Sequence, residues 1–240
     1  MLEREAGRTR PDDQRERSQS LALVLLLSAT AGSTDAIGFL GLNGLFTAHI
    51  TGNIVILAAH LVAHGRAAIA QLIAVPVFMA VLALARLLGL ALDRRGKGAA
   101  GMTLLVIQFA FLLGFLLLCL PLGRSFDADA PWVVLAGMCG VAAMAVQNGL
   151  VQIVMPGAPS TAVLTTNVTR FTVAAVESVA GPATGRGAAR EKVAANFRPI
   201  IGFLIGCAAG AFLQWQIGLI ALVLPAALGL IAILVDARRA

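Results

Sequence analysis

Long apolar runs alternate with short polar stretches along almost the whole chain. A helix that crosses a bilayer needs about 20 predominantly apolar residues. The runs fall at 19–40, 46–64, 68–92, 101–122, 131–155, 161–181, 198–214 and 216–235. The pattern predicts an all-α integral membrane protein in which residues 19–235 form a single membrane domain.

Polar residues gather at the two ends of the chain. Residues 1–18 mix arginines with acidic residues and have no apolar periodicity, which predicts a disordered tail. Residues 236–240 form a second, shorter polar tail. The charge argument below leads us to expect both tails in the cytoplasm.

Charged residues between the apolar runs bear on how many runs cross the membrane. If the arginine-rich tail is cytoplasmic and all eight runs cross, the basic loop 93–97 lies outside, against the positive-inside rule. If 46–64 and 161–181 enter without crossing, this loop lies inside, and Arg66 alone remains misplaced. We therefore expect six full transmembrane helices plus two broken or re-entrant segments. Eight transmembrane helices are the alternative.

The two segments expected not to cross resemble each other. Residues 47–55 read TAHITGNIV and residues 161–169 read TAVLTTNVT. Each follows an apolar helix with polar residues near its end, and each precedes a helix with an early proline. These features predict two repeated halves, about 19–122 and 131–235. Three full spans per half make the second half inverted, whereas eight spans make the halves parallel.

Inverted halves are a common construction of secondary transporters. In such folds the substrate binds near the midplane on discontinuous helices, because non-helical backbone is tolerated there only where it is buried or lines a cavity. We expect a small secondary transporter or permease for an unidentified small polar solute, with proton or ion coupling as one form. A channel-like pore, a membrane scaffold and an intramembrane enzyme are the alternatives.

Composition agrees with the membrane and argues against other classes. Apolar residues make up 59% of the chain and charged residues 12%, against about 25% charged residues in soluble domains. The net charge is +6, but the basic residues lie mostly in tails and loops and tyrosine is absent, so we expect no nucleic-acid partner. No phosphate loop, dinucleotide fingerprint or nucleophile elbow occurs, so we expect no cofactor and no enzymatic activity.

One stretch resembles a known family. Residues 34–53 read TDAIGFLGLNGLFTAHITGN, which joins Asp-Ala to a Phe-x-Ala-x-x-Thr-Gly-Asn pattern. With QNG at 147–149 and NFRP at 196–199, the chain resembles the YoaK-like family of bacterial membrane proteins from about residue 20 to its end. The resemblance implies a multi-pass protein of the bacterial inner membrane. It implies no activity, because the family is a domain of unknown function.

Asp35, which follows Thr34 inside the first apolar run, is the first candidate for function. An acid at the centre of a membrane helix costs about 2.5–3.5 kcal/mol on insertion scales, so it should face a partner or a wet cavity. This predicts a proton or cation site, or a contact to a cationic substrate. The alternative is a structural acid that pairs with an arginine or caps the broken helix that follows.

The two breaks supply the next candidates. Glycine permits dihedrals that unwind a helix, and Thr and Asn side chains bond the freed backbone groups. The helix N-terminus after a break suits an anion or carboxylate. The second break has Thr166 where the first has glycine. The candidate residues at the breaks are Thr47, His49, Thr51, Gly52, Asn53, Thr165 and Asn167.

Four further polar residues lie inside apolar runs. Arg170 and Glu177 are seven apart and share nearly one helical face, from which Arg170 can neutralise Asp35 or bind an anion. Gln147 and Asn148 occupy the place of Asp35 in the repeat, where they bind substrate or hold helices together. Arg86 is a second candidate partner of Asp35.

The remaining motifs predict packing instead of chemistry. His60 and His64 have a spacing that can chelate a metal, but no third ligand is near in sequence and we expect no metal site. The small-residue repeat Gly202, Gly206 and Gly210 predicts a helix-packing face, inside the protein or at a homodimer contact.

Overall fold

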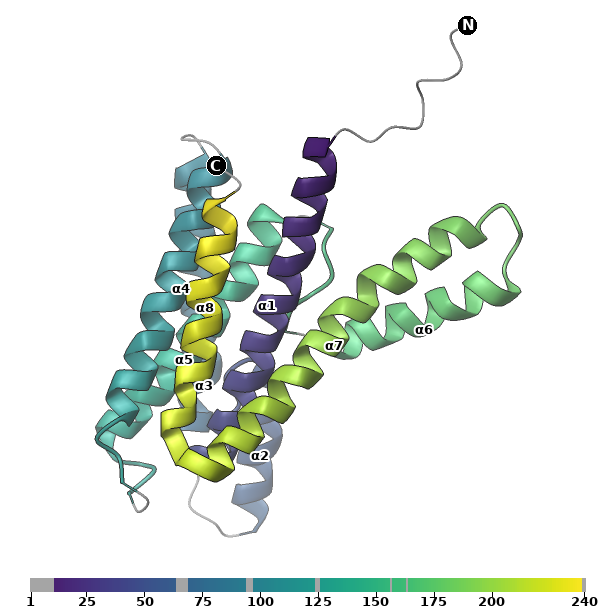
Figure 1. Ribbon diagram of the computed structural model, residues 1–240. Coiled ribbons are helices and arrows are strands. Elements are labelled where there is room, and N and C mark those ends of the chain that lie inside the picture. Colours follow the sequence, from purple (N-terminus) through teal and green to yellow (C-terminus); the bar gives the residue numbers. More distant parts are fainter. Residues whose placement is uncertain are drawn as a thin grey trace, which may run out of the picture.

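Helices joined by loops make up the described part of the chain. The computed structural model describes residues 11–63, 69–93, 97–123, 126–155, 157–162 and 164–238. Within these ranges no strand occurs, so the predicted all-α class is confirmed. The elements are α1 (Pro11–Gly41), α2 (Ile50–Val62), α3 (Ile69–Asp93), α4 (Lys97–Cys119), α5 (Pro131–Val154), α6 (Leu164–Ala180), α7 (Arg186–Ile217), the 3₁₀ turn η1 (Gly218–Leu222) and α8 (Val223–Ala237) (Figure 1).

Several helices are long and apolar enough to cross a membrane, so the chain is a multi-pass membrane protein. The last candidate is 52 residues long and contains α7, η1 and α8. Within it the chain reverses direction at Gly218, where φ is 64° (Figure 1). α2 has only 13 residues, fewer than the roughly 20 that a bilayer core requires. The described candidates are Ser20–Gly41, Ile69–Leu92, Ala99–Cys119, Pro131–Val154 and Arg186–Ala237.

α5 is the central helix of the bundle. In an apolar stretch of 18 residues within Pro131–Val154, 78% of the residues are buried, against 17% in such a stretch of Ile69–Leu92 in α3. α5 packs against α3 and α4, α1 packs against α7 and α8, and α4 contacts α8. The outer face of α3 exposes large apolar side chains such as Leu72, Met79 and Leu84. Exposed apolar surface of this extent is what a bilayer covers.

Glycines allow α1 and α7 to cross in close contact. A Cβ atom at Gly206 would clash with the carbonyl group of Ala29, and one at Gly210 would lie 2.8 Å from the Cα atom of Ser33. A Cβ atom at Gly202 would lie 2.9 Å from the carbonyl oxygen of Leu25. The small-residue face that we expected inside the protein or at a homodimer contact is therefore an internal packing face.

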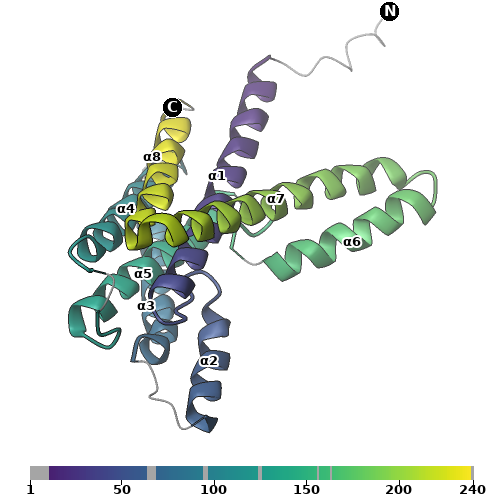
Figure 2. The same ribbon diagram turned by 60° about the horizontal axis from the view of Figure 1, so that its bottom comes forward.

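Two non-helical segments interrupt the bundle, and each lies before the position where the sequence predicts a break, since residues 51–53 and 165–167 are helical. The first joins α1 to α2 over residues 42–49, and its turn uses positive φ angles of 52° at Asn43 and 82° at Gly44. The second joins α5 to α6 over residues 155–163, part of which is described. After it, α6 and the first half of α7 form a hairpin that extends away from the other helices in both views (Figures 1 and 2).

Two helices begin earlier than the sequence pattern predicts. α1 begins at Pro11, so residues 11–18 of the expected disordered tail are helical, while residues 1–10 lie outside the described ranges. Proline suits the first turn of a helix, and extending an existing helix is far easier than starting one. α7 begins at Arg186 instead of residue 198, so Pro199 lies in its interior and the basic residues before it are helical.

Candidate functional site

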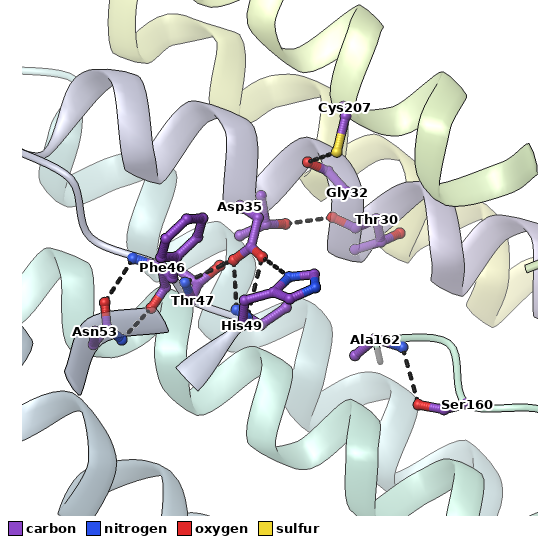
Figure 3. Close-up of polar contacts among 12 residues, drawn as sticks. Thr30, Gly32, Asp35, Phe46, Thr47, His49, Asn53, Ser160, Ala162 and Cys207 are labelled. Carbon is purple, nitrogen blue, oxygen red and sulfur yellow. Dashed lines mark hydrogen bonds and ion pairs between the residues drawn. The ribbon is translucent and has the colours of Figure 1, made fainter. Parts of the chain in front are cut away.

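The side chain of Asp35 lies at the first break and is 3% exposed. Its Oδ1 atom accepts hydrogen bonds from the Thr47 amide (2.7 Å), the Thr47 hydroxyl (3.0 Å) and the Ala48 amide (2.6 Å). Its Oδ2 atom accepts from the His49 amide (3.1 Å) and lies 2.6 Å from His49 Nδ1 (Figure 3). The carboxylate therefore gathers five donor groups from three consecutive residues just before α2.

This arrangement makes Asp35 the anchor of the non-helical residues that lead into α2. An ionised carboxylate only accepts hydrogen bonds, and every group around Asp35 is able to donate one. The negative charge also lies at the positive end of the helix dipole. Asp35 forms its ion pair with His49. Neither Arg170 on α6 nor Arg86 on α3 pairs with it, because both side chains are exposed elsewhere.

The side chain of Asn53, which lies in α2, forms hydrogen bonds with the backbone of the same break. Its Oδ1 atom accepts from the Phe46 amide at 2.9 Å, and its Nδ2 atom donates to the Phe46 carbonyl at 2.8 Å. The Phe46 ring packs so closely on Gly52 that a Cβ atom there would lie 2.7 Å from it. Gly52 is helical, so our expectation that it unwinds the chain is wrong: Asn43 and Gly44 make the turn, and Gly52 gives space to an aromatic ring.

The second break is held by an amide in place of the acid. Gln147 on α5 donates from Nε2 to the Thr161 hydroxyl (3.0 Å) and to the Leu27 carbonyl (2.9 Å). Its Oε1 atom accepts from Gln108 Nε2 on α4 at 2.7 Å. Thr161 aligns with Thr47 in the sequence repeat, so each of these threonines bonds a buried polar side chain of the preceding helix.

Asn167 is placed like Asn53. Its Nδ2 atom donates to the Ser160 carbonyl at 2.5 Å, across the same seven-residue separation as Asn53 and Phe46. Both asparagines are buried near the start of the short helix that follows a break. In each break, an asparagine side chain thus replaces the backbone partner that a continuous helix would have supplied.

A cavity of about 550 Å³ opens beside Asp35 and His49. The His49 side chain is 36% exposed, and its ring meets the Phe203 ring edge-on at 5.3 Å between centroids. Thr51 and Gly52 contribute the only other predicted residues of this wall. The lining residues are Asp35, Ala36, Phe39, Leu40, Phe46, His49, Thr51, Gly52, Val55, Phe203 and Cys207.

A separate cavity of about 470 Å³ lies between α6 and α7. Arg170 and Glu177 of α6 line it together with Lys192 of α7. None of these three side chains forms an ion pair in the described part of the chain. The predicted residues of the second half therefore do not converge with those of the first half on one site.

The remaining predicted residues bond within their own helices. The Thr34 hydroxyl donates to the Thr30 carbonyl at 2.6 Å, and Asn148 Nδ2 donates to the Met144 carbonyl at 2.9 Å. Thr165 is exposed on α6 and lines neither cavity. Thr47 is fully buried and reaches only Asp35.

A family model covers nearly the whole chain. The model described as "Protein of unknown function (DUF1275)" matches residues 23–235. The chain belongs to this family. The resemblance to the YoaK-like family that the sequence predicted is thereby confirmed. Among curated proteins and among solved structures, no significant match is found.

In this DUF1275 chain, aromatic residues form a part of the cavity that the sequence reasoning missed. Phe39, Phe46 and Phe203 line it, and Cys207 donates to the Gly32 carbonyl at 3.4 Å next to it. The spacing of Phe39 and Phe46 around the break was the available signal. Phe203 had none, because its approach depends on how α7 crosses α1.

The two histidines with a metal-chelating spacing, His60 and His64, are not found in a described cluster of possible metal ligands. Within the ranges that the structure describes, no group of three or more His, Cys, Asp or Glu residues is placed to hold a metal ion. His60 lies in α2, and its sequence neighbour His64 is outside the described residues.

Proposed function

We propose that this DUF1275 protein is a small secondary transporter of the bacterial inner membrane. Six helices cross fully, α1, α3, α4, α5, the second half of α7, and α8, while α2 and α6 belong to re-entrant segments. Both termini lie in the cytoplasm. A small solute moves through the protein, and a proton moves with it through His49.

Helix packing supports two inverted halves. α1, the first helix of the first half, packs against α7 and α8, the last two helices of the second half. In turn α5, the first helix of the second half, packs against α3 and α4, the last two helices of the first half. In Figure 1, α1 and α5 run in opposite directions, as do α4 and α8. Reciprocal packing and opposite helix directions are expected of two halves related by a twofold axis in the membrane plane.

The two breaks support the same relation. Asp35 bonds Thr47 and Gln147 bonds Thr161, while Asn53 and Asn167 each bond a carbonyl seven residues earlier. The halves thus share a way to hold non-helical backbone inside an apolar bundle, although one uses a charge and the other an amide.

One observation carries the proposal: a His–Asp pair lies at the start of a broken helix and faces a cavity. Asp35 is held as an acceptor by five donors. His49 must carry a hydrogen on Nδ1 to bond it, which leaves Nε2 as the ring atom that can take up or release a proton. An exchangeable proton beside a cavity is what coupled transport requires.

The experiment uses purified protein in proteoliposomes that contain a pH-sensitive dye. A panel of small solutes is added outside, and internal pH and solute uptake are followed together. We expect at least one solute to enter with saturable kinetics and to change internal pH. His49→Gln should abolish the pH change, whereas His60→Gln, in α2 and outside the cavity, should not.

Two outcomes would contradict the proposal. Flux that rises linearly with concentration and does not exchange solute would indicate a pore. Coupled transport that survives in His49→Gln would exclude His49 as the proton carrier.

A further inference from the structure

We propose that the cavity beside His49 binds a monocarboxylic acid with an apolar, preferably aromatic, body, together with one proton. This rests on the proposed transport function and names the substrate class of that site. The inference follows from the cavity wall, from the atoms of Asp35 that are already engaged, and from the His49 Nε2 atom, which can exchange a proton.

Most of the wall is apolar and aromatic. The Phe39 and Phe46 rings lie 4.8 Å apart between centroids, Phe46 and His49 lie 6.1 Å apart, and His49 and Phe203 lie 5.3 Å apart. Leu40 and Val55 extend this surface. A volume of about 550 Å³ falls in the range of sites for drug-sized ligands. The ligand body that fits is therefore a compact apolar group, and aromatic rings suit such walls best.

Asp35 is not available to a ligand. Its two oxygens accept five bonds from Thr47, Ala48 and His49, against about four lone-pair positions in a carboxylate. A cationic amine would have to displace one of the bonds that hold the break. The direct amine contact that an intramembrane aspartate suggests is therefore disfavoured.

Two polar side-chain groups of the cavity wall are available to a ligand, the His49 Nε2 atom and the Thr51 hydroxyl, and only Nε2 can take up a proton. Nδ1 is bound to Asp35 at 2.6 Å, and no hydrogen bond to Nε2 is found among the described residues. In the neutral ring, with the hydrogen on Nδ1, Nε2 is an acceptor. A carboxylic acid can transfer its O–H proton to Nε2, and the carboxylate formed then accepts a bond from the new N–H group.

The charges around the cavity require that proton. No lysine or arginine lines it, and the titratable groups that face His49 are Asp35 on α1 and Cys207 on α7. A bound carboxylate beside ionised Asp35 would face a like charge with no opposing charge. Protonated His49 between the two carboxylates opposes the added negative charge, so the net charge of the cluster stays what it was with Asp35 ionised and His49 neutral. Acid and proton are therefore taken up together.

The experiment measures binding and proton uptake in one titration. The full chain is placed in lipid nanodiscs and titrated calorimetrically at pH 7 with 2-naphthoate, in two buffers of different ionisation enthalpy. The matched probes are 2-naphthamide and 2-naphthylmethylamine. The ion pair with Asp35 favours the protonated form of the His49 ring, so we expect proton uptake on naphthoate binding to rise towards one as the titration is repeated at higher pH. We expect the amide to bind without uptake and the amine not to bind.

Three variants locate the site. His49→Gln should weaken naphthoate binding about tenfold or more and remove its proton uptake, since a charge-assisted bond is lost. The same change should leave binding of the amide nearly unaltered. Val55→Trp should fill the cavity and block both probes, whereas Leu72→Trp, on the exposed face of α3, should block neither.

Several results would overturn the inference. These are naphthoate binding without proton uptake, binding no tighter than the amide, or binding insensitive to Val55→Trp. Naphthoate binding that occurs in detergent but not in nanodiscs would show that lipid chains fill the cavity, which also excludes the proposal.

The inference and the transport proposal fail separately. Proton-linked naphthoate binding without uptake into proteoliposomes would keep the ligand class and remove the transport function. Proton-coupled uptake of some other solute, with no naphthoate binding, would keep the transport function and remove the ligand class.

Discussion

Asp35 and His49 divide between them the two roles that the sequence assigned to a single acid. A buried charge within a membrane helix is tolerated when protein groups replace water around it. Asp35 has those groups in Thr47, Ala48 and His49. Asp35 therefore holds the break in place, and His49, which is partly exposed to the cavity, is the group able to exchange a proton.

Replacing Asp35 tests its structural role. Asp35→Asn turns one acceptor oxygen into an NH₂ group that faces N–H donors, so buried donors lose their partners. Each such loss costs about 1–3 kcal/mol, and we expect the protein to lose roughly 2–4 kcal/mol of stability. Thermal unfolding in nanodiscs measures the loss. Asp127→Asn, in the exposed loop before α5, should change the stability little. An equal loss of stability in both variants would contradict the structural role of Asp35.

Asn53 and Asn167 should each stabilise the non-helical segment that precedes its own helix. Asn53→Ala removes both side-chain bonds to Phe46, and Asn167→Ala removes the bond to Ser160. We expect backbone amide exchange to rise about tenfold to a hundredfold over residues 42–49 in the first variant. The second should raise it over residues 155–162. Hydrogen–deuterium exchange with mass spectrometry resolves the two segments.

Asn148→Ala is the matched control for the asparagine variants. Its amide bonds only the Met144 carbonyl of its own helix, so exchange at the breaks should stay at the wild-type rate. If Asn148→Ala loosened a break as much as Asn53→Ala, the bonds to Phe46 would not be what closes it.

The sequence predicted the breaks better than it predicted their contacts. The aligned letters around Asn53 and Asn167 placed both breaks, because each asparagine completes backbone bonding locally. The bond between Asp35 and Thr47 depends on a reversal at Asn43 and Gly44, which apolar periodicity does not encode. Reading Gly52 as the flexible position was wrong for the same reason.

At the level of helices, the crossing of α1 and α7 forms one wall of the cavity. Phe203 and Cys207 reach it only because Gly202 and Gly206 let the two backbones approach. The sequence predicted that glycine face but not its partner. It also missed the early start of α7, because the charged residues after Arg186 resemble a loop unless the helix that follows extends into them.

Adding a methyl group at this crossing distinguishes packing from helix propensity. Glycine to alanine in a helix interior normally gains about 1 kcal/mol. At Gly206 the new Cβ atom clashes with the backbone of Ala29, so we expect Gly206→Ala to lose about 1–3 kcal/mol instead. Thermal unfolding measures the sign. Gly187→Ala, where a Cβ atom meets open space, should be neutral or stabilising, and a gain at Gly206 would contradict the close crossing.

At the level of the whole molecule, the two proposed halves differ in the polar groups at their breaks. The His–Asp cavity lies beside the first break and is completed by Phe203 and Cys207 of α7, whereas the charged cavity lies between α6 and α7. The pair Gln147 and Thr161 has no titratable group where the first half has Asp35. The halves therefore share their construction, but proton exchange is expected in the first half alone.

Membrane topology is the property on which the inverted arrangement depends. Six full spans place the loop between α4 and α5 outside and the start of α7 inside, whereas eight spans place both inside. Gly123 and Gly187 are exposed, and a Cβ atom at either meets open space, so single cysteines there should not disturb the fold. They are introduced into a chain whose native cysteines are replaced. Intact cells are then treated with a membrane-impermeant maleimide.

We expect Gly123→Cys to react in intact cells and Gly187→Cys to react only after permeabilisation. Gly187 lies on the cytoplasmic side in both topologies, so its labelling reports whether the membrane is intact. Gly123 lies outside with six spans and inside with eight, so its labelling distinguishes the two topologies. If Gly123→Cys reacts only after permeabilisation, all eight segments cross and the halves are parallel. The midplane position of the two breaks, and with it the argument for coupled transport at His49, would then lose its structural basis.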